Sequence, residues 1–227
     1  QRVLGDRLGG LIRDLHRDHG VELRPRATVA ELRGTKTVDA VVLEDGRVEP
    51  ADVVVAGIGA LPRAGLAEEA AGLRVQDGIV VDQCLGTSVH GVFAAGDVAN
   101  AWDPVGHRHR RVEHWANALN QGFAAGRNAA GAREPYARLP YFYSDQYDLG
   151  MEYVGHHGPD DALVVRGDLG ARELIAFWHR DGLVTAAANV NVWDVVDDLK
   201  ALIEARTPVD PARLADPEVP LPDLVPA

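Results

Sequence analysis

The first quarter of the chain holds one amphipathic segment and several short apolar runs. In residues 3–19 the apolar positions recur at helical spacing and Gly20 follows, which predicts a helix that ends at this glycine. The short runs predict strands at 21–24, 28–33, 40–43 and 48–49, with an Asp45-Gly46 turn between the last two. Residues 52–56 are apolar after the first position, which predicts a strand buried on both faces and followed by a turn over 57–62.

The middle of the chain combines short apolar runs with a polar stretch and a helical one. Residues 78–82 predict a short strand, and residues 91–97 predict a buried strand that ends at Gly96-Asp97. Residues 102–111 are rich in histidine and arginine and predict a polar loop. Residues 112–130 contain many small residues between their aromatic ones and predict a helix.

The pattern changes after Pro135. Residues 140–145 are aromatic and turn-like. Four alternating runs predict a small antiparallel sheet with strands at 150–155, 162–167, 173–179 and 183–190. Residues 193–206 carry apolar side chains on one face and predict a helix. The last twenty residues contain six prolines, which predict a tail that lies extended on the surface.

Composition and charge narrow the function classes. The 227 residues carry a net charge of -11 and a pI near 5.2, which disfavours nucleic acid or an anionic membrane as a partner. Cys84 is the single cysteine, so neither an internal disulfide nor a Cys-x-x-Cys redox pair can form. The sequence contains no apolar run long enough to span a bilayer, and its first residues do not have the form of a signal peptide. We therefore predict a cytoplasmic protein that does not bind membranes.

The strongest chemical signal is the Gly96-Asp97 pair. Glycine lets a ligand approach the backbone, and the carboxylate that follows can accept hydrogen bonds from sugar-type hydroxyls. On the dipeptide alone, a turn in which Asp97 caps a helix is the preferred interpretation. Glu113, His114 and Trp115 open the next predicted helix, whose N-terminus offers unpaired N–H groups and partial positive charge. Without the preceding motif, Trp115 is best interpreted as a core aromatic residue.

Two longer segments resemble a known family. Residues 87–97, Thr-Ser-Val-His-Gly-Val-Phe-Ala-Ala-Gly-Asp, resemble the second flavin-binding segment of flavoprotein reductases that have two dinucleotide-binding domains. The resemblance implies that Asp97 binds the ribityl chain of FAD. Residues 54–63 resemble the stretch in which the NAD domain returns the chain to the FAD domain, which implies that Gly57 lies near the nicotinamide cofactor. Arg63 stands where the family usually has Asn.

Two further segments support the same resemblance. Residues 112–118 resemble the start of the helix that points at the flavin pyrimidine ring, which implies that Glu113, His114 and Trp115 lie at the flavin. Residues 140–148, Pro-Tyr-Phe-Tyr-Ser-Asp-Gln-Tyr-Asp, resemble the opening of the C-terminal domain in ferredoxin reductases of Rieske oxygenase and P450 systems. Apoptosis-inducing-factor-like proteins share this arrangement. Tyr143 replaces the family's usual Trp.

These segments resemble the FAD-dependent NAD(P)H:ferredoxin reductases. The implied fold class is α/β: a partial, Rossmann-like core of two dinucleotide-binding domains, followed by a small α+β C-terminal domain with an antiparallel sheet and a terminal helix. The implied parts are the end of an NAD(P)-binding domain at 1–62, the end of an FAD-binding domain at 63–132, a reductase or interface domain at 133–207, and a proline-rich tail at 208–227.

The resemblance also implies the chemistry. NAD(P)H would pass a hydride to FAD, and the reduced flavin would deliver single electrons to a ferredoxin-type iron–sulfur protein. This chemistry requires no acid, base or nucleophile, so we assign no catalytic and no metal-binding residues. The sequence contains neither Gly-x-Gly-x-x-Gly loop of the family, and the resemblance places both before Gln1. We therefore expect a fragment that holds FAD weakly or not at all and is inactive alone.

Other interpretations concern the partner. The basic residues within 107–111 suggest a docking surface for an acidic ferredoxin, with a solvated loop as the simpler explanation. Residues 133–207 could instead serve as a dimerisation or interaction module, as in apoptosis-inducing-factor-like proteins, and a homodimer is possible. The acceptor could also be rubredoxin or another protein.

Overall fold

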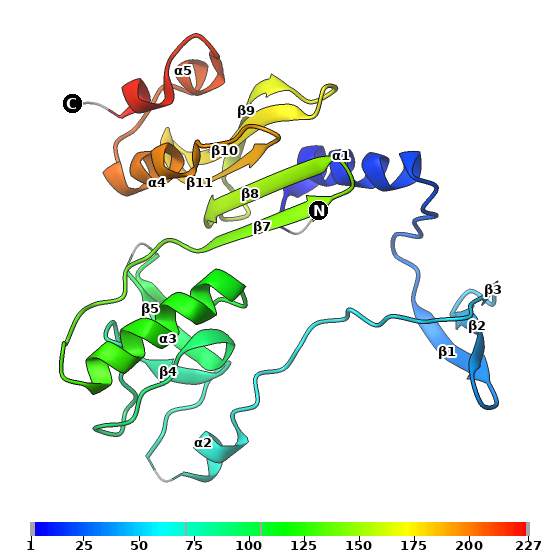
Figure 1. Ribbon diagram of the computed structural model, residues 1–227, viewed down its shortest axis with the longest axis horizontal. Coiled ribbons are helices and arrows are strands. Elements are labelled where there is room, and N and C mark those ends of the chain that lie inside the picture. Colours follow the sequence, from blue (N-terminus) through cyan, green and yellow to red (C-terminus); the bar gives the residue numbers. More distant parts are fainter. Residues whose placement is uncertain (1–2, 71, 105, 226–227) are drawn as a thin grey trace. The chain divides into compact units, whose positions relative to one another are not determined.

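The computed structural model describes residues 3–70, 72–104 and 106–225. The chain divides into two compact units, residues 1–61 and residues 62–227, and each is described by itself (Figure 1). Within the described ranges, every helix is too short or too polar to cross a lipid bilayer.

The first unit consists of a helix and a small antiparallel sheet. Helix α1 spans Gly5–Asp18 and buries Leu8 and Leu15, as its helical spacing predicts. The sheet has the order β1-β2-β3, formed by Val29–Gly34, Val38–Leu43 and Val48–Pro50. The turn between β2 and β3 contains Gly46, whose φ of +85° suits glycine.

Two strands predicted for this unit are wrong. Residues 21–24 and 52–56 form no strand, and the side chains of Val53 and Val55 are 77% and 90% exposed. Within the described part of the first unit, the sheet ends at β1 and β3, so the run at 52–56 has no neighbouring strand to pair with. An apolar run becomes a buried strand only where its backbone groups find partners.

The second unit begins with a small mixed sheet and a long helix. Helix α2 spans Gly65–Glu69, and the sheet has the order β4-β5-β6 from Ile79–Val81, Ala99–Asp103 and Arg108–Arg111. Strands β4 and β5 are parallel, whereas β5 and β6 form an antiparallel hairpin. The 3-10 turn η1, Gly96–Val98, directly precedes β5, and helix α3 spans Trp115–Ala129.

The structure corrects two predictions in this region. Residues 102–111 are mostly strand rather than loop, because their backbone groups pair across the β5–β6 hairpin despite the polar side chains. Gly96-Asp97 does not end a buried strand. The pair lies in η1, after a segment in which Phe93 makes only an isolated bridge to Gly86.

The C-terminal part is a five-stranded antiparallel sheet of order β7-β8-β11-β10-β9. In chain order, the strands are β7 (Tyr141–Gln146), β8 (Leu149–Gly155), β9 (Ala162–Asp168), β10 (Glu173–Arg180) and β11 (Leu183–Val190). The four predicted strands are confirmed, but residues 141–145 belong to strand β7 rather than to a turn. Helix α4, Val196–Ala205, packs on β8 and β11 through Leu199, Leu202 and Ile203 (Figure 1).

The predicted extended tail is wrong. Residues after α4 form helix α5, Pro211–Ala215, and the 3-10 turn η2, Leu221–Leu224. Leu214 and Leu224 are fully buried in the core under the sheet, while Asp210 caps α5 by accepting the N–H of Ala212 at 2.9 Å. Arg166, itself buried, donates from Nη2 to the carbonyl of Pro217 at 3.0 Å and also to that of Val219. Apolar burial therefore folds the tail back onto the sheet despite its prolines.

Candidate functional site

The turn at Gly96 is built against helix α3. Gly96 is buried and has a φ of +74°, and its N–H donates to the side-chain Oε1 of Gln121 at 2.9 Å. A Cβ at this position would lie 3.3 Å from the Cβ of Ala118. Close packing and the left-handed backbone therefore both favour glycine here.

Asp97 follows in the same turn with an exposed side chain. Among the described residues, none makes a hydrogen bond or an ion pair with its carboxylate, whereas its backbone carbonyl accepts from Nη1 of Arg111 at 3.2 Å. The capping interpretation is not observed, because α3 begins after His114 and has no side-chain cap. The carboxylate is thus fixed through its backbone and directed to solvent.

Arg111 organises the surroundings of Asp97. Its side chain is only 15% exposed, and the guanidinium donates from Nε to Asp77 Oδ1 at 3.0 Å and from Nη1 to Glu113. The hydrogen bond with Glu113 is the main reason why the pKa of Arg111 lies above its ordinary value, and Asp77 adds to it. Sequence reasoning did not give Arg111 this role, and it treated Glu113 as a ligand contact rather than as the partner of an arginine.

His114 precedes the first residue of α3, at a helix end with no side-chain cap and no acidic residue in the first turn. Its Nδ1 is buried and has no hydrogen-bond partner among the described residues. Burial lowers the pKa of His114, although Asp97 and Glu113 oppose the shift, so the imidazole is neutral at pH 7. The start of α3 therefore presents uncapped N–H groups beside a neutral histidine.

Trp115 is exposed rather than part of the core. Its side chain is 74% exposed, and Leu119 and Phe123, one and two turns further along α3, are 46% and 68% exposed. The core interpretation of Trp115 is therefore wrong for this structure. The three side chains form an exposed apolar stripe along α3 that begins at the helix N-terminus.

A chain of aromatic rings anchors His114 to the C-terminal sheet. Its ring meets Phe142 edge-on at a centroid distance of 5.0 Å, and Phe142 stacks on Tyr153 at 4.9 Å. Tyr153 in turn lies 5.4 Å from Trp178. Tyr153 and Trp178 are buried, and burial is the main cause that raises the pKa of Tyr153 to about 12. The five-stranded sheet thereby helps to fix the start of α3.

The predicted site residues of the second unit lie in two neighbouring elements, and one predicted residue lies elsewhere. Gly96 and Asp97 belong to η1, which contacts α3, and Glu113, His114 and Trp115 lie at the start of α3. Gly57 belongs to the first unit, where it is exposed and a Cβ would meet nothing within 4 Å. Its proximity to a nicotinamide stays a prediction.

The predicted basic docking surface is not formed by Arg110 and Arg111. Each arginine side chain is only 15% exposed, and each is paired with an aspartate, Asp103 at 3.2 Å and Asp77 at 3.0 Å. Arg108 on the same strand is exposed and has no ion pair with any described residue. The hairpin therefore uses two of its three arginines for internal contacts.

Comparisons with known proteins show which families this chain is similar to. Residues 1–122 match the family described as pyridine nucleotide-disulphide oxidoreductase, and residues 141–225 match the reductase C-terminal family. The ferredoxin--NAD(+) reductase component of an anthranilate 1,2-dioxygenase system from Burkholderia cepacia is 39% identical over 96% of this chain and 54% of its own length. Human apoptosis-inducing factor 3 is 31% identical over 89% of this chain and 34% of its own length.

A solved structure shows the same fold. The chain superposes on the putidaredoxin reductase of a covalent putidaredoxin reductase–putidaredoxin complex with a TM-score of 0.92 and 34% identity, covering 99% of this chain and 54% of that one. The chain thus spans about half the length of the reductases that it matches.

The fold and the comparisons together define a mixed α/β architecture followed by a reductase-type C-terminal domain with an antiparallel sheet, which confirms the predicted fold class. The chain belongs to the pyridine nucleotide-disulphide oxidoreductase family. Its members use FAD and NAD(P)H, as predicted from the sequence.

Proposed function

We propose that this chain supplies one part of the FAD site of a reductase that passes electrons from NAD(P)H through FAD to a ferredoxin-type iron–sulfur protein. The observation that carries the proposal is the carboxylate of Asp97, which is exposed and unpartnered among the described residues. A carboxylate fixed in this way is an acceptor without a donor, and the ribityl hydroxyls of FAD are donors of the right kind.

The neighbouring residues fit the other parts of the flavin. Gly96 lets the turn that carries Asp97 pack closely against Ala118 of α3, and the uncapped N-terminus of α3 favours negative charge nearby. A bound flavin accepts a hydride and releases single electrons, and its reduced form carries negative charge on the pyrimidine side. The N–H groups at the start of α3 suit that charge.

Two other side chains support this site from the protein's side. Arg111 holds the backbone of Asp97 and the carboxylate of Glu113, so that the acceptor stays in place without losing its own charge to an ion pair. Trp115 offers a flat apolar surface at the helix start, which can cover a planar ring and exclude water from it.

The acceptor is proposed from the relatives. The B. cepacia protein is named as a ferredoxin reductase component, and the similar structure is a putidaredoxin reductase joined to putidaredoxin. Both names support a ferredoxin-type partner for the protein to which this chain belongs. The cytoplasmic location and the homodimer remain predictions.

The test measures FAD binding by the 227-residue chain through quenching of flavin fluorescence. We expect weak, saturable binding, and we expect Asp97→Asn to weaken it about tenfold, because hydrogen bonds to a charged group contribute about 1.5–3 kcal/mol. Trp115→Ala should reduce the quenching more than the affinity, since a stacked indole is the quencher.

The matched control is Asp52→Asn, which removes an exposed carboxylate in the first unit and should leave binding unchanged. Equal affinities of Asp97→Asn and the unmodified chain would refute the role of Asp97. A chain that purifies with tightly bound, stoichiometric flavin would contradict the expectation of an incomplete site.

A further inference from the structure

The second unit contains a cavity between the β5–β6 hairpin and the C-terminal sheet. It has a volume of about 480 Å³. Its walls come from the β5–β6 turn, the segment that leads into β7, the β8–β9 connection and the β10–β11 turn. None of the residues assigned to the flavin site lines it.

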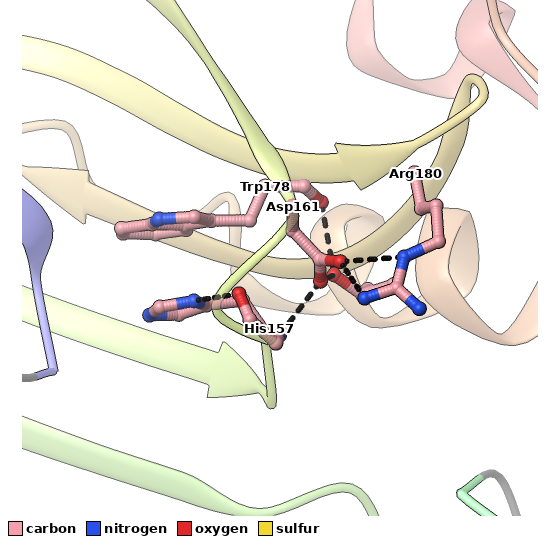
Figure 2. Close-up of polar contacts among 6 residues, drawn as sticks. His157, Asp161, Trp178 and Arg180 are labelled. Carbon is pink, nitrogen blue, oxygen red and sulfur yellow. Dashed lines mark hydrogen bonds and ion pairs between the residues drawn. The ribbon is translucent and has the colours of Figure 1, made fainter.

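One wall of this cavity is rigid and electrically balanced. Asp161, whose side chain is 2% exposed, accepts from Arg180 Nε and Nη2 at 3.0 and 2.7 Å and from the Thr185 hydroxyl at 2.7 Å. It also accepts the N–H of Gly158 at 2.8 Å, which fixes the β8–β9 connection. Figure 2 shows Asp161 and Arg180 facing each other across this ion pair. The charges of Arg180 and Asp161 therefore neutralise each other, and this pair contributes little to the binding of a charged ligand.

The opposite wall carries an incompletely balanced arginine. Arg110 makes a single ion pair, from Nη2 to Asp103 at 3.2 Å, and its Nε and Nη1 are buried without a partner among the described residues. Burial lowers the pKa of Arg110, against the opposing effect of Asp103. A desolvated cation with one long ion pair projects a stronger field than a cation in water, and the field favours a negative charge nearby.

Two more arginines line the cavity without an ion pair to any described residue. Arg108 is exposed, and Arg138 is exposed and makes one long hydrogen bond to Asn120 at 3.3 Å. Asp181 is the single aspartate of the lining that has no arginine partner. The lining thus carries a surplus of positive charge in a protein whose net charge is -11. Between the arginines lie apolar side chains, among them Pro104, Leu139 and Leu183.

We propose that this cavity binds a small organic carboxylate. Arg108 and Arg138 hold the carboxylate in the field of Arg110, since guanidinium groups match carboxylates in geometry and charge. The apolar body of the ligand packs against Leu139 and Leu183. Arg110 is largely buried in the cavity lining, so a small molecule can approach it, whereas a flat protein surface would contact only the residues at the cavity entrance.

The test uses benzoate as the probe and calorimetric titration of the 227-residue chain at constant ionic strength. We expect saturable binding of benzoate and none of benzylamine, which has the same ring and the opposite charge. Inorganic phosphate should bind more weakly than benzoate, because it lacks an apolar body. Phosphate that binds as tightly as benzoate, or benzoate that does not saturate, would overturn the proposal.

Substitutions then assign the site. Arg108→Ala and Arg138→Ala should each weaken benzoate binding about tenfold, and both positions are exposed, so folding is not at risk. Arg7→Ala, an exposed arginine of α1, is the matched control and should have no effect. Asp103→Asn should tighten binding severalfold, because it releases the charge of Arg110 from its partner. Merely structural damage would weaken binding, so a loss of affinity in Asp103→Asn would refute the assigned role of Arg110.

Discussion

The side chain of Gln121 accepts the backbone N–H of Gly96 at 2.9 Å across 25 residues of sequence, and both residues are buried. This bond ties the turn that carries Asp97 to the second turn of α3. The position of the exposed carboxylate therefore depends on a side chain that never touches it.

Gln121→Ala should destabilise the protein by about 1–3 kcal/mol, because the buried N–H of Gly96 loses its acceptor. Urea unfolding followed by circular dichroism measures the change. Gln83→Ala, at an exposed glutamine, is the control and should stay within about 0.5 kcal/mol of the unmodified chain. Equal stabilities of the two variants would show that the bond does not matter.

Gly96→Ala should cost more stability than Gly91→Ala. Both glycines have positive φ, +74° and +80°, so both substitutions carry the left-handed penalty of about 1–2 kcal/mol. Only at Gly96 would the new Cβ press on Ala118, at 3.3 Å, whereas at Gly91 it would meet nothing within 4 Å. We expect a further loss of about 1 kcal/mol at Gly96. Equal losses of stability in thermal or urea unfolding would mean that α3 can shift to accommodate the new Cβ without a cost in free energy.

Asp161 should make stability depend on pH. Burial alone would raise the pKa of its carboxyl, but hydrogen bonds from Thr185, Gly158 and Arg180 outweigh burial and hold the pKa below its ordinary value. The contribution is therefore fully present above the unfolded-state pKa of about 3.9 and is lost as the pH falls through the lower folded-state pKa.

We thus expect Asp161→Asn to lose about 1.5–3 kcal/mol at pH 7 and progressively less as the pH falls below about 4. Unfolding of both proteins at several pH values measures this difference. Asp160→Asn, at the exposed neighbouring carboxyl, corrects for general acid effects. A difference between Asp161→Asn and the unmodified chain that stays constant down to low pH would contradict the assigned pKa direction.

Leu214→Ala should destabilise the C-terminal part by about 2–5 kcal/mol, since the side chain is fully buried in the core under the five-stranded sheet. Leu66→Ala, at a leucine that is 89% exposed, should change stability little. Thermal unfolding of the two variants distinguishes a packed C-terminal segment from a loose one, which would tolerate both substitutions alike.

Sequence patterns predicted the elements whose partners are neighbours in the chain. The strands from 149 to 190 are joined by short connections, so their alternating residues and turns locate them to within about two residues at each end. The tail was missed because prolines suggest extended structure locally, whereas its fold depends on burying Leu214 and Leu224 against distant strands. The strand predicted at 52–56 is wrong for the opposite reason: the residues have strand propensity, but no described strand of the first unit pairs with them.

The candidate site also divides into features that local sequence predicts and features that depend on distant residues. Asp97 was identified from its motif, but the element around it was wrong, because φ at Gly96 and the contact with Ala118 are tertiary properties. The sequence places Arg111 in a basic cluster that suggests a docking surface. Its structural role rests on Asp77, 34 residues earlier, and no local pattern reports a pairing of that kind.

Arg166 sets a limit on how the C-terminus can be shortened. Its guanidinium is buried in β9, and the carbonyls that it meets belong to Pro217 and Val219. Trimming the chain before these residues would remove both carbonyls from the Arg166 guanidinium and would also remove Leu224 from the core under the sheet. A shortened variant should therefore be less stable than the full chain, which makes the last residues part of the folded C-terminal core rather than an appendage to it.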